Sequence, residues 1–357
     1  VAIGNAASAT NAETTAVGKQ ALASGSNAAA FGHRAIASGS YSFAAGSWCT
    51  AGGVGSAALG GSGLASGGVS ASAAWSTAIG LNSLALGSQT ATGSGAMALG
   101  GSYASGTDSF AAAITNNTNT YGATGANSVA IGDLTKSTNT NSVALGNGAT
   151  SSSIGSVAIG DDASASGSGS VALGYNTVAT STRAYALSAY GRAEAVYSAT
   201  LFGARAKSSV QGKAAYGPAY LVGQGEVQGG MLVCTASTSD TTAAALTTTN
   251  SAAGTTNQVI LPNNSAYSFS GTIVARQQAS TGTACAAWEV KGLIRREGSA
   301  GTTVLVNSAT TILDNTPAWG MTLSADTTNG GLKIEVTGAA ATNIRFVATI
   351  NTSEVTY

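Results

Sequence analysis

The chain has 357 residues, of which 49 are glycine and only 8% are charged, and its formal net charge at pH 7 is zero. No stretch approaches the ~18 consecutive apolar residues of a membrane span, and no basic stripe is present, so we expect neither a membrane span nor a nucleic-acid partner. A monomer with so little charge would associate readily, which favours an oligomer that buries much of each chain.

A tetrad of the form Val/Ala-Ala-Ile/Leu-Gly recurs every fourteen residues through more than half of the chain. Its clearest copies end at Gly132, Gly146, Gly160 and Gly174. A short fixed period is typical of a solenoid, in which each repeat stacks on the last and contacts only its neighbours. Because fourteen residues are too few for a helical repeat, we expect each repeat to be one coil of β-strands.

The most regular coil runs from Ser156 to Gly169 and predicts two short strands with a turn after each. Successive side chains of a strand point to opposite faces, so Val157 and Ile159 share one face and Ala158 takes the other. Both faces are apolar, yet one coil encloses room for a single thin layer of small side chains. The second layer must be covered from outside, most simply by an identical chain related by rotation. The sequence predicts an obligate homo-oligomer and leaves open which face is inner.

The same register extends along the chain with a few irregular intervals. Earlier tetrads end at Gly4, Gly18, Gly32, Gly46, Gly60, Gly80 and Gly100, and degenerate copies end at Gly203 and Gly217. Two intervals stretch to twenty residues, and the interval from Gly100 to Gly132 fits two coils with four residues added. We expect the extra residues to loop outward around 68–76 and 115–127. The count is about fifteen coils, stacked at ~4.8 Å each.

The pattern Ser-Val-Ala-Ile-Gly-x-x-Ala-x-Ala-x-Gly resembles the head repeat of trimeric autotransporter adhesins, which also recurs in tail fibres and tail spikes of tailed phages. The resemblance covers roughly residues 1–217 and is strongest over 128–174; Phe31, Phe43 and Ala45 depart from the pattern, as does the aromatic-rich stretch from Tyr175. It implies a left-handed parallel β-roll built by three chains. The residues that this predicts for the core of the coil or the trimer are Val129, Ile131, Val143, Leu145, Val157, Ile159, Val171 and Leu173.

Composition changes after Gly217, so we predict a connector over residues 218–230 and a C-terminal domain over 231–357. Segments of this domain such as 273–276 and 345–350 alternate apolar and polar residues, and turn signals lie between them. Short alternating strands at this spacing indicate an antiparallel β-sandwich or jelly roll. The segment also resembles a C-terminal domain of phage tail fibres. The predicted fold is therefore all-β throughout.

Aromatic residues outside the tetrads are the best candidates for receptor contact, because aromatic rings stack on sugars and supply rigid contact area. In the repeat region these candidates are Trp48, Trp75, Tyr103 and Tyr121. The alternative is that each covers the edge of a coil or a neighbouring chain.

Two further candidates lie in the C-terminal domain. Trp319 follows Pro317 and is expected on a loop, whereas Trp288 lies in an alternating strand and is expected in the core. Arg295 and Arg296 are consecutive, so one of them points outward; Arg296 is the receptor candidate, with an ion pair between chains as the alternative.

No residue pattern indicates catalysis, a cofactor or a metal site, so we predict that the chain is not an enzyme. The single histidine, His33, is expected on a solvated turn, and the carboxylates show no glycosidase pair. Asp133, Asn147 and Asp161 repeat at one coil position, where they either suit the turn or form a ladder for a cation. The three cysteines, Cys49, Cys234 and Cys285, are expected to be free thiols, with a Cys234–Cys285 bridge as the alternative.

The leading hypothesis is a homotrimeric phage tail fibre or spike that combines a structural shaft with binding of a bacterial surface polysaccharide or protein. Its partners would be two further copies, the cell-surface receptor and other tail proteins of the virion. The first alternative is the passenger head of a bacterial trimeric adhesin on the cell surface, which a heptad pattern after the repeats would favour. Further alternatives are a purely structural collar or shaft fibre and a polysaccharide-cleaving spike. Because Val1 falls within a repeat, we expect the chain to be part of a longer one.

Overall fold

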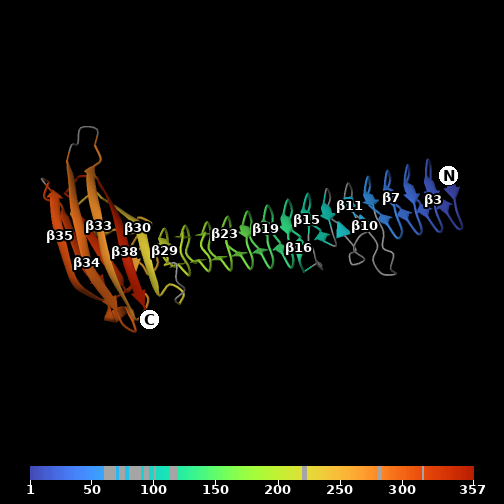
Figure 1. Cartoon of the computed structure of the whole chain (residues 1–357). Coiled ribbons are helices and arrows are strands. Elements are labelled where there is room, and N and C mark those ends of the chain that lie inside the picture. The colour runs from blue at the N-terminus through green and yellow to red at the C-terminus, as the bar shows by residue number, and fades with distance from the viewer. Residues whose placement is uncertain are drawn as a thin grey trace. The chain divides into compact units, whose positions relative to one another are not determined.

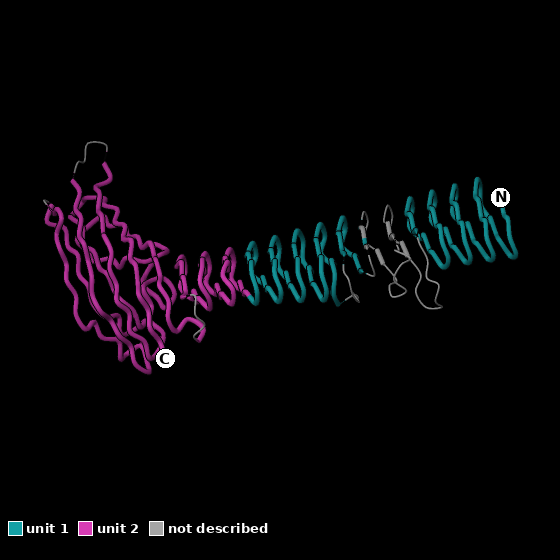
Figure 2. The backbone as a smooth tube through the Cα atoms, in the orientation of Figure 1, with its two compact units in different colours: residues 1–176 teal, residues 177–357 magenta. Residues whose placement is uncertain are grey.

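The computed structural model describes residues 1–59, 70–71, 77–79, 90–91, 96–99, 102–112, 120–218, 223–279, 284–315 and 317–357. These residues form β-strands joined by turns, with one 3-10 turn, η1, at Ala300–Thr302. In the described part of the chain, no helix is long and apolar enough to cross a membrane. The chain divides into two compact units, residues 1–176 and residues 177–357 (Figure 2).

Unit 1 is a β-solenoid whose short strands form two parallel rows (Figure 1). The first row holds the tetrads and consists of β1 (Ala2–Ile3), β3 (Thr15–Val17), β5 (Ala29–Phe31), β7 (Phe43–Ala45), β9 (Ala57–Leu59), β11 (Thr77–Ile79), β13 (Met97–Leu99), β15 (Phe110–Ala112), β17 (Val129–Ile131), β19 (Val143–Leu145), β21 (Val157–Ile159) and β23 (Val171–Leu173). The second row consists of β2 (Ser8–Ala9), β4 (Leu22–Ala23), β6 (Ile36–Ala37), β8 (Thr50–Ala51), β10 (Ser70–Ala71), β12 (Thr90–Ala91), β14 (Tyr103–Ala104), β16 (Gly122–Ala123), β18 (Lys136–Ser137), β20 (Thr150–Ser151) and β22 (Ser164–Ala165). The predicted parallel β-roll is confirmed.

Equivalent residues of successive coils pair with one another, so the register follows the tetrad and not a fixed residue count. In the regular part, Ala144 pairs with Ala158. The tetrads also pair where the spacing changes: Ala58 pairs with Ala78 across twenty residues, Ala98 with Ala111 across thirteen and Ala111 with Ala130 across nineteen. The interval between Gly100 and Gly132 therefore holds two coils, as predicted.

The two predicted outward loops are narrower than expected where the structure describes them. Ser70 and Ala71 form strand β10 in the second row, and residues 122–123 form β16 in the same row. Part of each segment that we assigned to a loop is therefore a β-strand of the second row. The remainder of these segments, 68–69, 72–76 and 115–119, lies outside the described residues.

The structure shows which face of the coil is the inner one. The middle alanine of the regular tetrads, such as Ala144 or Ala158, has no exposed surface. The residues on either side of it point outward, and Ile131 and Ile159 keep 41% and 38% of their surface exposed. The inner layer is made of small residues, mainly alanine and serine with Cys49 and Thr135 among them, because little space separates the two strands of one coil. The aliphatic residues predicted for the core of the coil or the trimer lie on the outer face of the coil.

Serine completes the inner layer by closing the turn before each tetrad. The Ser156 hydroxyl donates to the Ser153 carbonyl at 2.7 Å and lies 2.6 Å from the Ser151 hydroxyl across the coil. Ser128 makes the same turn contact, donating to the Gly125 carbonyl at 2.6 Å. These local bonds satisfy the buried hydroxyl groups of Ser128 and Ser156, whereas the hydroxyls of Ser42, Ser109 and Ser170 are buried without a partner.

Unit 2 begins with three more strand pairs and continues into a β-sandwich. The strand pairs are β24 (Val178–Ala179), β25 (Tyr185–Ala186), β26 (Arg192–Ala193), β27 (Ala199–Thr200), β28 (Lys207–Ser208) and β29 (Ala214–Tyr216). The larger sheet of the sandwich is antiparallel in the order β35 (Val304–Asp314), β34 (Cys285–Arg296), β33 (Ser265–Gln277), β38 (Ile344–Thr356) and β30 (Val227–Thr238). The smaller sheet consists of β31 (Ala244–Ala245), β32 (Val259–Ile260), β36 (Gly320–Asp326) and β37 (Gly331–Thr337).

One hydrophobic core joins the two sheets of the sandwich. Ile273 and Trp288 from the larger sheet and Leu332 and Val336 from the smaller one are buried in it. Strands of the larger sheet alternate buried and exposed residues along their length, as a sheet covered on one face must. The predicted antiparallel sandwich is confirmed, and so is the core position of Trp288.

Substitution of the tetrad glycine is predicted to destabilise the solenoid, whereas substitution of the glycine in the other turn is not. Gly146 has φ +123°, and a Cβ there would lie 2.5 Å from the Gly160 carbonyl oxygen. Gly146→Ala should therefore cost about 1–3 kcal/mol per chain in the free energy of unfolding. Gly155 is the control, because it has φ +62° with open space around it, and its equivalent one coil earlier is Asn141 at φ +56°. Gly155→Asn should leave the urea midpoint unchanged; equal losses in the two variants would contradict the turn geometry.

Candidate functional site

The two rows of strands in unit 1 present chemically different outer surfaces. We call the outward side chains of the first row the apolar face; at its centre it consists of Val129, Ile131, Val143, Leu145, Val157, Ile159, Val171 and Leu173. We call the outward side chains of the second row the hydroxyl face; at its centre it consists of Thr138, Thr150, Ser152, Ser164 and Ser166, together with one lysine, Lys136. Every residue of both sets is partly or fully exposed in the isolated chain. A single coil thus has one surface suited to water and one suited to burial.

Trp48 lies at a corner of the solenoid in a stacked cluster. Its φ is +63°, and 39% of its surface is exposed. The Arg34 guanidinium lies 4.4 Å from the centre of the Trp48 ring, and Arg34 Nε donates to Gln20 Oε1 at 2.7 Å. His33 lies on the same turn as Arg34, and its ring meets the Trp48 ring edge-on, with 6.0 Å between the two centroids. The cluster offers an aromatic ring and a cation at one exposed corner, the combination that protein surfaces use for sugars and anions.

The other aromatic candidates in the repeat region lie apart from Trp48. Tyr121 is half-buried, with Lys136 Nζ 4.7 Å from its ring centre. Tyr103 is half-buried in β14, where it points outward from the second row. Trp75 lies outside the described residues. The structure therefore brings neither Tyr103 nor Tyr121 into the cluster around Trp48.

The two candidates in the C-terminal domain are held by structural contacts. Trp319, expected on a loop, is only 4% exposed, and its ring packs edge-to-face against Phe346 at 6.2 Å. Its burial corrects the expectation of an accessible side chain, and the reason is that it fills the sandwich core beside Phe346. Arg296 is half-buried and donates from Nη1 to the Leu261 carbonyl at 2.6 Å, whereas Arg295 is exposed and pairs with Glu297. Of the two arginines, Arg295 is the one that points outward.

Sequence reasoning missed two arginine–tyrosine pairs at the corners of unit 2. Arg183 Nη1 donates to the Tyr197 hydroxyl at 2.6 Å, and Arg205 lies 5.4 Å from the Tyr190 ring centre. Arg183 and Tyr197 are fourteen residues apart, so the period itself could have shown that they stack. The corners of both units thus carry exposed cation–aromatic contacts.

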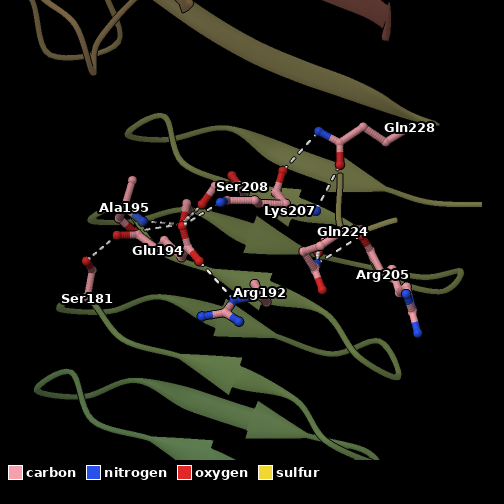
Figure 3. A network of polar contacts seen from close by, with 11 residues as sticks. Ser181, Arg192, Glu194, Ala195, Arg205, Lys207, Ser208, Gln224 and Gln228 are labelled. Carbon is pink, nitrogen blue, oxygen red and sulfur yellow. Dashed lines mark hydrogen bonds and ion pairs between the residues drawn. The ribbon is translucent and has the colours of Figure 1, made fainter. Parts of the chain in front are cut away.

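A polar network in unit 2 joins the last coils to the sandwich (Figure 3). The Glu194 carboxylate accepts from Arg192 Nε at 2.9 Å and lies 3.2 Å from Lys207 Nζ. The Gln228 side chain then pairs with the Lys207 backbone, accepting from its N–H at 2.8 Å and donating to its carbonyl at 3.0 Å. The same Gln228 amide donates to Glu354 Oε2 at 2.7 Å. The network therefore runs from exposed charges on β26 and β28 to a carboxylate on β38.

At the inner end of this network, Lys213 and Glu354 form a buried ion pair. Lys213 Nζ lies 2.6 Å from Glu354 Oε1, and their side chains are 5% and 1% exposed. The Lys213 ammonium also lies 5.6 Å from the ring centre of Tyr267. Burial, followed by the charge of Glu354 and a hydrogen bond with it, raises the pKa of the Tyr267 phenol well above its ordinary value. This ion pair joins the residue before β29 to strand β38.

The remaining chemistry-bearing residues stand apart. All three cysteines are free, with Cys49 and Cys234 buried and Cys285 exposed, so the alternative of a Cys234–Cys285 bridge is wrong. Within the described ranges, no three His, Cys, Asp or Glu side chains are close enough to hold a metal ion. Asn147 and Asp161 lie exposed on their turns, where their backbone carbonyls accept from the next coil.

With the coil geometry in view, the comparisons with known proteins identify the repeat. The model of the YadA head domain repeat matches residues 23–47, 123–149 and 151–177. The chain carries adhesin-type head repeats. The first segment spans β5, β6 and β7, and the others span the regular coils from β17 to β23, so the resemblance expected from the tetrads is confirmed.

Other comparisons are more distant. A search of curated protein sequences gives no match. Among solved structures, the chain is similar to a tailspike protein, gp49 of the Acinetobacter baumannii bacteriophage Fri1, described as a capsular polysaccharide depolymerase. The identity is 9% and the TM-score 0.24; the similarity covers 95% of this chain but 64% of the tailspike, less than two thirds of its length. The head repeats fit a phage tail fibre or spike, or an adhesin.

The tailspike match also corrects one prediction. That protein is described as a depolymerase, which is an enzyme. The finding contradicts the prediction that the chain is not an enzyme, and we withdraw that prediction. Its basis was the absence of a facing pair of acids in the sequence, and a pair of acids can also come from residues that only a folded assembly brings together.

The buried ion pair is predicted to be essential to unit 2. Lys213→Met would leave the Glu354 carboxylate buried without its cation, which should cost about 3–5 kcal/mol in the free energy of unfolding. Arg295→Met is the matched control, because its pair with Glu297 is 51% and 48% exposed; its loss should stay below about 1 kcal/mol. Urea titration followed by circular dichroism measures both, and similar losses would show that Glu354 is not dependent on Lys213.

Proposed function

We propose that this chain is the shaft and receptor-binding part of a homotrimeric phage tail fibre or spike. The observation that supports this is the contrast between the two rows of unit 1. The apolar face is continuous over four coils from Val129 to Leu173, while the hydroxyl face of the same coils carries serine and threonine. A monomer would expose the apolar face to water over its whole length. Three copies that pack their apolar faces together would leave the hydroxyl faces in solvent.

The energetics favour such an assembly. Each aliphatic side chain of the apolar face is already half-covered in the isolated chain, so burying the rest contributes about 1 kcal/mol. The eight central residues then supply on the order of 8 kcal/mol per chain, before the outer coils are counted. The entropy cost of association is about 4–15 kcal/mol, so four coils alone are marginal and a longer stack of coils is sufficient. A long shaft and an obligate oligomer are therefore linked.

Receptor binding in this proposal rests on exposed groups at the coil corners and on the sandwich. The cluster of Gln20, Arg34 and Trp48 is the best formed of them in the repeat region, since its ring and cation are held by their neighbours. Tyr103, Tyr121 and Trp75 remain proposed contacts. Three copies in one fibre would multiply weak individual contacts through avidity. The receptor class that we propose is a bacterial surface glycan or protein.

The second candidate function is the passenger head of a bacterial trimeric adhesin. The match of the YadA head domain repeat to three segments of the chain favours it. Both functions use the same trimeric shaft, so the shaft alone does not separate them. They differ in where the protein is found, on the virion tail or on the bacterial surface.

The trimer is tested by light scattering of the purified chain, with an expected mass of about three times 34.3 kDa. Ile159→Asp places a charge on the apolar face and should lower the urea concentration at which the trimer dissociates by at least 1 M, or prevent assembly. Ser166→Asp, on the exposed hydroxyl face of the same coil, should leave the mass and the urea midpoint unchanged. A folded wild-type monomer at micromolar concentration would overturn the proposal.

The phage assignment is tested by immunogold electron microscopy of a lysate from the source strain. An antibody against residues 231–357 is expected to place gold on the tails of virions. Gold on the outer surface of cells, with virion tails unlabelled, would assign the protein to the adhesin class. An antibody adsorbed with the purified chain controls for background labelling.

A further inference from the structure

We propose that a groove on the exposed face of the sandwich binds an acidic saccharide, through two arginines that stand side by side. This deepens the proposed function, on whose receptor-binding part it rests. The groove has a volume of about 530 Å³ and lies over strands β30, β33 and β38 of unit 2. Its size is within the range of ordinary small-ligand sites, about 300–1,000 Å³.

The cationic end of the groove is set by strand register. Arg345 of β38 pairs with Arg276 of β33 on one side and with Ser237 of β30 on the other. All three side chains are exposed on the same face. Side chains directly opposite one another in an antiparallel pair have Cβ atoms about 4.5–5.5 Å apart, and like charges in that position repel. An anion between the two guanidinium groups removes this repulsion and accepts hydrogen bonds from both.

Two observations support an anionic ligand. None of the described residues that line the groove is aspartate or glutamate. The Arg345 guanidinium also lies beside the Gln278 amide; with that amide turned so that its oxygen faces the guanidinium, the oxygen accepts from Nη2 at 3.1 Å and from Nη1 at 3.3 Å. A planar guanidinium held at the mouth of a groove matches the geometry of a carboxylate better than that of a neutral hydroxyl group.

The rest of the groove fits a sugar ring better than a free ion. Next to the arginine pair, Val347 and Val274 stand opposite each other and are 41% and 44% exposed. They form a flat apolar patch of the kind on which the C–H face of a pyranose packs. Asn250 lines the groove together with Ser237 and supplies amide and hydroxyl groups suited to sugar hydroxyls. An acidic sugar matches all three parts of the groove: its carboxylate would bind the arginines, its ring face would pack on the valines, and its hydroxyls would bond to the polar rim.

A neighbouring hollow on the same sheet shows that the arginine groove is distinct. It is lined by Glu289 and Lys291, whose opposite charges do not select an anion. Lys291 therefore provides a matched control, since it is a cation on the same face in a different hollow.

The test is calorimetric titration of the full chain with oligogalacturonate and oligoglucuronate, and with the same oligosaccharides after reduction of their carboxyl groups. We expect the acidic forms to bind, the reduced forms to bind at least tenfold more weakly, and the affinity to fall as salt rises. Arg276→Gln and Arg345→Gln should each weaken binding at least tenfold, while Lys291→Gln changes it less than twofold. Absence of binding by both acidic oligosaccharides, equal binding of the reduced forms, or an equal effect of Lys291→Gln would overturn the proposal. Displacement by inorganic phosphate at equal concentration would reduce the site to a general anion site and overturn the saccharide assignment.

The rate at which the Cys285 thiol is alkylated measures access to the groove in the assembled protein, because Cys285 pairs with Arg276 on the neighbouring strand. Burial raises the pKa of Cys49 to about 11 and that of Cys234 to about 12, so alkylation at pH 8 reports on Cys285. We expect rapid alkylation that oligogalacturonate slows in the wild type but not in Arg345→Gln. A native protein whose Cys285 does not react without saccharide has this face covered by another copy, which overturns the site. The trimer mass and the immunogold result do not depend on the titration or the alkylation experiment. If the groove does not bind acidic saccharides, the tail-fibre proposal is therefore unaffected.

Discussion

The narrow interior of a fourteen-residue coil is the constraint on which unit 1 depends. Between its two rows of strands there is room for one layer of alanine and serine, as Ala144, Ala158 and Ser156 show by having no exposed surface. So small a core buries little apolar area for each coil, and burial of apolar area is the main force that stabilises a fold. The coil compensates with a complete ladder of backbone hydrogen bonds and with larger aliphatic residues placed outside, where a second copy can cover them. The narrow interior of the coil thus also accounts for the aliphatic residues on its outer face.

The sandwich of unit 2 is stabilised differently, by large side chains buried between two sheets. Once the strands lengthen to a dozen residues, as in β33 and β38, each sheet can bury large side chains such as Phe269 and Phe346 against the other. The change of architecture leaves the end of the last coil to be closed, and β30 does so by pairing antiparallel with β29. Lys213 and Glu354 lie buried beside that junction, where an ion pair specifies a single alignment more strictly than apolar contacts would.

The repeats could be predicted from the sequence because each strand depends only on its neighbours. The tetrad register follows from counting residues, including the two coils between Gly100 and Gly132, although their division into thirteen and nineteen residues came only from the strand pairing. The inner face could not be predicted, because Val157, Ala158 and Ile159 make both faces apolar and only the width of the coil decides between them. Trp319 and Arg296 depended on contacts with Phe346 and Leu261, which are distant in sequence. The arginine pair of the groove was hidden for the same reason, since 276 and 345 meet only through the sheet.

The corners of the coils have a consequence for evolution. At these positive-φ positions the chain already accepts Gln20, Arg34, Trp48, Asp162 and Tyr190, residues with no chemical property in common. The backbone there is held by the ladder between coils and not by the side chain, so a corner can change identity without changing the fold. Neighbouring corners stack, so two substitutions fourteen residues apart create a new pair of touching groups on the surface. Diversity of recognition can therefore arise by point mutation alone, on a scaffold whose interior holds only small side chains.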